Sequence, residues 1–153
     1  MATSACSSLE IVRILKTEIC SQIRIDRKTN TAEPKISIPL KISGLDAVLG
    51  GFPSNVLTEI FGAAGSGKTQ LCLQLAANLL KTDSKAKVLI ICTQERFSID
   101  RMVSFLGDEN SSLLDRIHVE YFLDPEVELH FFRFVIHNLM NEFKYSLIIY
   151  DGI

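Results

Sequence analysis

Residues 62–69 form the segment whose residue types and spacing most clearly suggest chemistry. The sequence there is Gly-Ala-Ala-Gly-Ser-Gly-Lys-Thr, which fits the pattern G-x-x-x-x-G-K-[ST] at every fixed position. Small residues let the backbone curl so that successive N–H groups surround phosphate oxygens. The lysine of such a loop supplies charge to the β and γ phosphates, and the hydroxyl after it is placed for Mg²⁺. We therefore predict a nucleoside triphosphate site made of Gly62, Ala63, Ala64, Gly65, Ser66, Gly67, Lys68 and Thr69, with Lys68 also in a catalytic role.

A carboxylate further along the chain supports this interpretation. Asp151 directly follows the apolar run Leu-Ile-Ile-Tyr at residues 147–150, which is typical of a buried strand. In phosphate-loop proteins an aspartate at the tip of such a strand helps to hold Mg²⁺. Many unrelated strands also end in aspartate, so the position downstream of the loop carries the argument. We predict that Thr69 and Asp151 are the metal ligands.

The elements that must position these residues alternate between strands and helices. Apolar runs without alternation predict buried strands, and spacings of three and four predict helices. The predicted strands are 56–61, 88–92, 117–122 and 147–150, and the predicted helices are 69–80, 99–106 and 126–143. Strands of this kind separated by helices indicate a parallel sheet that is covered by helices on both faces. The expected fold class is α/β.

The N-terminal region is predicted to stand outside this core. Apolar residues recur at helical spacing over residues 8–24, and the polar residues 27–34 resemble a linker. The helix would either pack on the domain behind it or dock a partner. We therefore divide the chain into a helix and linker (1–35) and a core (36–153), which begins with an extended segment at 35–42 and a short helix at 44–49.

Composition limits the remaining possibilities. The chain has 153 residues with 47% apolar side chains, which suits one domain with a real core. The net charge of −2 gives no sign of a nucleic-acid binder. The cysteines at 6, 20, 72 and 92 form no Cys-x-x-Cys pair, and the histidines do not complete a zinc spacing, so we expect reduced thiols in an intracellular protein. No signal peptide or membrane-spanning stretch is evident, and no membrane partner is expected.

Several motifs together resemble the ATPase core of RecA-type recombinases, most closely the eukaryotic strand-exchange recombinase and its paralogues. The resemblance is carried by Ile-Ser-Gly-Leu-Asp at 42–46, Leu-Gly-Gly at 49–51, and the run from Leu57 to Cys72, and it extends over residues 36–153. It implies a P-loop NTPase (RecA-like) core that uses ATP and Mg²⁺. It also implies a nuclear protein of homologous recombination and double-strand break repair, which assists recombinase filament assembly on single-stranded DNA.

Two positions bear on catalysis within this resemblance. The position of the family's catalytic glutamate is occupied by Gln94, with Glu95 one residue later. A carboxylate can take a proton from the attacking water, whereas an amide can only orient it. We therefore expect a DNA-dependent ATPase with weak or absent turnover, and Glu95 substitutes only if the loop turns it inward; otherwise it is a solvated surface residue. Arg101 matches the family arginine that lies against the adenine, or else it is an ordinary surface arginine.

The ends of the chain also differ from the family pattern. The region before the core is shorter than the recombinase's DNA-binding domain and has no Phe-x-x-Ala tag, which favours a heterodimer with another recombinase paralogue, acting with the recombinase, over a long filament. In the family, the strand after Asp151 lies between the two Walker strands. We therefore expect a core that is incomplete at the C-terminus, with a vacant central position in the sheet and DNA-binding loops only in a longer protein. The aromatic residues Phe131, Phe132 and Phe134 are expected in the core rather than in a base-stacking platform.

Two other functions remain open. The chain could be a protein-interaction module in which the nucleotide is only structural. It could also be a small-molecule kinase, which would need an arginine-rich lid, but residues 101–133 contain only Arg101, Arg116 and Arg133.

Overall fold

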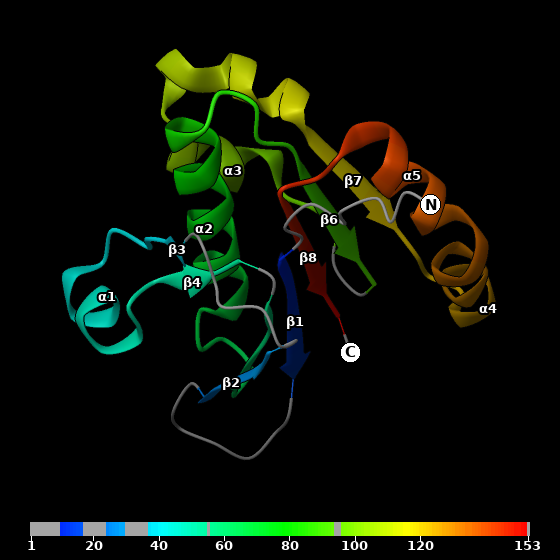
Figure 1. Cartoon of the computed structure of the whole chain (residues 1–153), viewed down its shortest axis with the longest axis horizontal. Helices are drawn as coiled ribbons and strands as arrows, with labels where there is room; N and C mark the ends of the chain where they lie inside the picture. The colour runs from blue at the N-terminus through cyan, green and yellow to red at the C-terminus, as the bar shows by residue number, and fades with distance from the viewer. Residues whose placement is uncertain (1–9, 17–23, 30–36, 55, 94–95, 153) are drawn as a thin grey trace, which may run out of the picture.

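The structure is a computed structural model that describes residues 10–16, 24–29, 37–54, 56–93 and 96–152 (Figure 1). In chain order the elements are β1 (Glu10–Lys16), β2 (Arg24–Thr29), β3 (Ser37–Ile38), α1 (Ser43–Leu49), β4 (Phe52–Pro53), β5 (Val56–Gly62), α2 (Lys68–Thr82), β6 (Val88–Cys92), α3 (Ile99–Leu106), the 3₁₀ segment η1 (Asp108–Arg116), β7 (Ile117–Tyr121), α4 (Pro125–His130), the π-helical turn η2 (Phe131–Val135), α5 (Ile136–Phe143) and β8 (Leu147–Asp151). The strands and helices predicted between residues 56 and 151 are confirmed to within two residues at each end.

Six strands form one sheet in the order β2-β5-β1-β8-β6-β7. All neighbouring strands from β5 to β7 run parallel, and β2 pairs antiparallel with β5 at one edge. The short strands β3 and β4 pair separately. Parallel strands need crossover connections, and helices α2, α3 and α4–α5 lie in those connections. The predicted α/β class with a mainly parallel sheet is confirmed.

Helices cover both faces of the sheet (Figure 1). Ile90 of β6 packs in one buried cluster with residues of α2 and α3, such as Leu75 and Met102. Its strand neighbour Ile91 faces the other way and packs in a second cluster with Phe131. Alternate residues of a strand point to opposite faces, so a continuous apolar run is what a doubly covered strand requires. No helix among the described residues has the length and hydropathy needed to cross a membrane.

The helix predicted for residues 8–24 is wrong for the part of it that the structure describes, and residues 8–9 and 17–23 lie outside the described residues. Residues 10–16 form strand β1, which lies between β5 and β8, and residues 24–29 form β2. The register pairs Ile11 with Leu57 on one side and with Ile148 on the other. A short run rich in Ile and Val fits either structure, and two neighbouring strands offer hydrogen bonds to both edges of a strand in this position. The central position that we expected to be vacant is therefore occupied by β1.

The aromatic residues of the long C-terminal helix are only partly in the core. Phe131 is buried at 5% exposure, whereas Phe132 and Phe134 are 39% and 63% exposed, so the prediction was wrong for these two. Residues 131–135 form a π-helical turn, so the side chains there do not follow the spacing of three and four on which the prediction was based. The helix thus presents aromatic side chains on its outer surface.

Candidate functional site

The predicted phosphate loop connects β5 to α2, which is the strand–loop–helix arrangement that its chemistry requires. Gly65 and Gly67 have φ angles of 76° and 91°, a left-handed conformation that glycine adopts without steric cost. A turn hydrogen bond from Ser66 N to Ala63 O, 3.1 Å long, closes the bend. The loop ends at Gly67, the N-cap of α2, so the positive end of the helix dipole faces the loop. An anion is favoured at this position.

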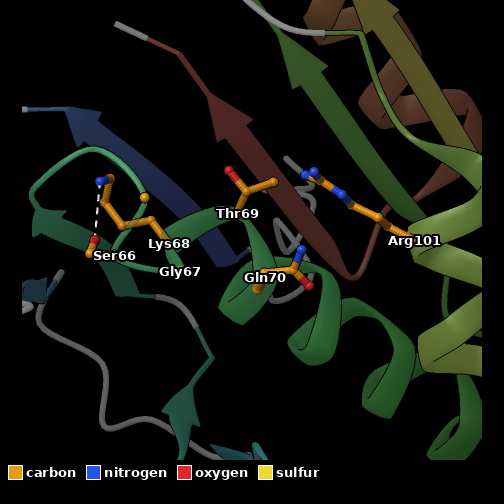
Figure 2. A pocket seen from close by; sticks show the side chains of 7 residues that line it. Ser66, Gly67, Lys68, Thr69, Gln70 and Arg101 are labelled. Carbon is orange, nitrogen blue, oxygen red and sulfur yellow. Dashed lines mark hydrogen bonds between the residues drawn. The ribbon is translucent and has the colours of Figure 1, made fainter.

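Lys68 is folded into the loop rather than extended toward solvent. Its side chain is buried, and Nζ donates hydrogen bonds to Gly62 O at 2.6 Å and Ala63 O at 2.7 Å. A longer bond of 3.3 Å reaches Ser66 Oγ (Figure 2). The ammonium group thus donates its hydrogen bonds to oxygens of the loop itself, whereas with a bound nucleotide phosphate oxygens would be the acceptors. Nucleotide binding requires Lys68 to exchange at least one of these partners.

Thr69 and Asp151 are brought together although they are 82 positions apart in the sequence. Thr69 Oγ1, in the first turn of α2, donates a hydrogen bond of 2.8 Å to Asp151 Oδ2 at the end of β8. A hydroxyl beside a carboxylate supplies the hard oxygen donors that Mg²⁺ prefers, and phosphate oxygens and water can complete its octahedron. Among the described residues, no group of three or more His, Cys, Asp or Glu side chains could hold a metal ion.

A cavity of about 300 Å³ opens over the loop. Its lining joins the loop to Arg101 of α3, which is exposed and points into the space beyond Thr69 (Figure 2). Gln70 also lines the cavity and was not predicted, although its place directly after the motif was a usable signal. The structure therefore gathers the loop, Lys68, Thr69 and Arg101 around one cavity, with Asp151 hydrogen-bonded to Thr69.

Comparison with known families identifies this arrangement. The family described as "ATPase: KaiC" matches residues 38–144, which is more than half of the chain. The chain belongs to this family of ATPases. Membership makes it a RecA-like P-loop domain, of a kind that uses a nucleotide and usually Mg²⁺.

Individual relatives of this ATPase domain are proteins of DNA repair. "DNA repair and recombination protein RadB" of Thermoplasma volcanium is 32% identical over 75% of the chain and 47% of its own length. RadB of Methanococcoides burtonii is 49% identical over 42% of the chain and 28% of its own. "DNA repair and recombination protein RadA" of Metallosphaera sedula is 38% identical over 48% and 25%. The chain thus spans less than half the length of these curated relatives.

The hydrolytic residues of the ATPase domain remain predictions. Gln94 and Glu95, the two candidates for the hydrolytic role, lie outside the described residues. The flanking residues are described: Thr93 follows β6, and Arg96 is exposed. The weak turnover expected from Gln94 is therefore not tested by the geometry.

Two buried thiols lie close to Thr69 and Asp151. Cys72 of α2 and Cys92 of β6 line a small cavity of about 30 Å³ that also touches Thr69 and Asp151. Burial, and then the negative charge of Asp151, raises the pKa of Cys92 to about 11 and that of Cys72 well above its usual value. Both thiols are free and protonated at neutral pH, which agrees with the expected small hydrophobic role. Cys6 and Cys20 lie outside the described residues.

Proposed function

We propose that the chain binds ATP with Mg²⁺ and acts in homologous recombination as a paralogue of the eukaryotic strand-exchange recombinase. The observation that carries this proposal is the convergence of Lys68, Thr69 and Asp151 at one phosphate loop. In this role the loop amides and Lys68 hold the triphosphate, and Thr69 and Asp151 hold the metal, which neutralises phosphate charge. The RadB and RadA relatives support the assignment to repair.

In the cell the proposed task is to assist recombinase filament assembly on single-stranded DNA, in the nucleus. A complementation assay tests it: cells that lack the protein are given the wild type or Lys68→Ala, and break repair by recombination is scored. We expect wild-type levels from the first and a defect from the second. The assignment would be refuted if the wild-type protein is absent from nuclei, or if cells that lack the protein repair breaks as well as cells that contain it.

Hydrolysis is proposed to be slow because a neutral amide, Gln94, replaces the catalytic carboxylate. A base that accepts the proton of water typically contributes a factor of about 10² to 10⁴ in rate. Measured release of phosphate in the presence of single-stranded DNA should therefore be low, and Gln94→Glu should raise it. An unchanged rate in Gln94→Glu, with ATP still bound, would show that turnover is limited elsewhere.

The proposed partner is another recombinase paralogue. The outer surface beside β7 supports a protein partner, because Leu123, Val127 and Phe134 are 77%, 54% and 63% exposed. β7 is also the edge strand of the described sheet, with β6 as its neighbour. Large exposed apolar side chains beside an edge strand mark interaction surfaces. Phe134→Asp should weaken co-purification with a paralogue without changing ATP affinity, which an unaltered complex would contradict.

The same surface favours a second candidate function. In that alternative the chain is a protein-interaction module, and the nucleotide only stabilises the fold. Complementation discriminates the two functions: Lys68→Ala that supports full recombination, while Phe134→Asp does not, would favour the interaction module.

A further inference from the structure

The end of β8 is held by contacts to α2 and to the residue that follows β6. Asp151, the last residue of the strand, accepts the hydrogen bond of Thr69 through its side chain and a bond of 3.2 Å from Thr93 N through its carbonyl oxygen. Gly152 follows and is buried, and a Cβ at this position would overlap the side chain of Thr93. Asp151 is therefore held toward α2 by its side chain and toward the end of β6 by its carbonyl group.

A separate contact holds the strand from the opposite face. Tyr150 O–H donates a hydrogen bond of 2.6 Å to Glu128 Oε1 on α4. Its ring also packs against Phe132, with the ring centroids 5.9 Å apart. Successive side chains of a strand point to opposite faces, so this contact fixes the backbone one residue before Asp151 from the side away from the nucleotide.

We propose that Tyr150 is a positioning residue for the metal site, with Glu128 as its anchor. The bond between them fixes the direction in which Asp151 leaves the sheet, so that its carboxylate meets Thr69 with the geometry that a divalent cation requires. Mg²⁺ accepts only near-ideal octahedral geometry, so a small reorientation of a ligand lowers its affinity. This inference rests on the proposed role of Asp151 in binding Mg²⁺ with ATP.

Tyr150→Phe tests the proposal because it deletes one hydroxyl and keeps the ring against Phe132. In the nucleotide-free full chain, the amide hydrogen of Thr93 reports on Asp151, since its acceptor is the Asp151 carbonyl. We expect Thr93 to exchange about tenfold faster in the variant. The amide of Ser146, bonded to Lys87 O at the far end of β8, should be unchanged.

Nucleotide binding supplies a second measurement that a purely structural role would not change. In Tyr150→Phe the Mg²⁺ concentration for half-maximal ATP binding should rise about tenfold, which is the lower end of the loss in metal affinity that is typical when a group that orients a metal ligand is removed. ATP affinity in EDTA should stay the same. Glu128→Gln keeps an acceptor oxygen and should restore most of the wild-type behaviour, whereas Glu128→Ala should resemble Tyr150→Phe. Tyr121→Phe, on β7, is the matched control and should resemble the wild type.

The outcomes separate this inference from the proposed function. Unchanged Thr93 exchange in Tyr150→Phe overturns the inference, even if the wild type binds ATP with Mg²⁺. Faster exchange with an unchanged Mg²⁺ requirement also overturns it, because the contact would then be structural only. A wild-type chain without Mg²⁺-dependent ATP binding would refute the proposed function, and the positioning role would fail with it.

Discussion

Replacing Lys68 by alanine gives the most direct test of the phosphate site. Lys68 is 4% exposed, and its ammonium group bonds Gly62 O and Ala63 O. A phosphate must therefore replace one of these bonds rather than add to a free charge. A hydrogen bond to a charged group contributes about 1.5 to 3 kcal/mol, and the carbonyl bond that is given up must be subtracted, so the net gain is about 1 to 2 kcal/mol. ATP affinity in Lys68→Ala should therefore fall about 5- to 30-fold.

Titration calorimetry with Mg²⁺ provides the assay, and two controls make it specific. AMP lacks the β and γ phosphates, so its affinity should change by no more than about twofold. Lys85→Ala removes the same charge from an exposed position after α2 and should bind ATP like the wild type. Denaturant unfolding confirms that each variant is folded. A folded Lys68→Ala that binds ATP within about threefold of the wild type would refute the assigned role of the loop.

Three further predictions follow from side chains around the site. Asp151→Asn should raise the Mg²⁺ concentration for half-maximal ATP binding about tenfold and leave binding in EDTA unchanged, because an amide carries no charge for the cation; an unaltered Mg²⁺ titration would exclude it as a ligand. Asn78→Ala should lower the free energy of unfolding by about 2 to 3 kcal/mol, because Asn78 Nδ2 donates a buried hydrogen bond of 2.6 Å to Leu40 O. Denaturant titration measures this change, and a decrease below about 0.5 kcal/mol would contradict the prediction. The pKa of Cys92 is raised from 9.0 to about 11, so as the pH rises the thiol ionises in the unfolded chain before it ionises in the folded one. The free energy of unfolding should therefore be unaffected by this thiol below pH 9 and should fall between pH 9 and 11, by at most about 1.4 kcal/mol per pH unit. Cys92→Ala should make that fall shallower, and an equal or steeper fall in unfolding experiments would contradict the cause.

The extent to which sequence predicts this site differs between its members. Glycine spacing and the Lys-Thr pair encode the bend locally, because left-handed residues and a helix start need no distant partner. Asp151 was predicted from its position after an apolar run downstream of the loop, whereas Arg101 was predicted only from a resemblance. The structure places Asp151 in a hydrogen bond with Thr69 and Arg101 at the cavity over the loop. Gln70 was missed because glutamine is not a fixed residue of the motif, and only its place directly after the motif indicated that it lines the cavity.

The amino-acid sequence by itself determined the phosphate loop, the buried strands and the helices between them, because each depends on periodicity or backbone preference within a short window. Only the tertiary structure decided that residues 10–16 form a strand, since Ile and Val in a short run suit both structures and the pairing partners lie more than 40 residues away. Tertiary structure also exposed Phe134 and joined Tyr150 to Glu128. The exposure of Phe134 and the bond between Tyr150 and Glu128 depend on which elements pack together. A local sequence pattern carries no information on the free energy of those contacts.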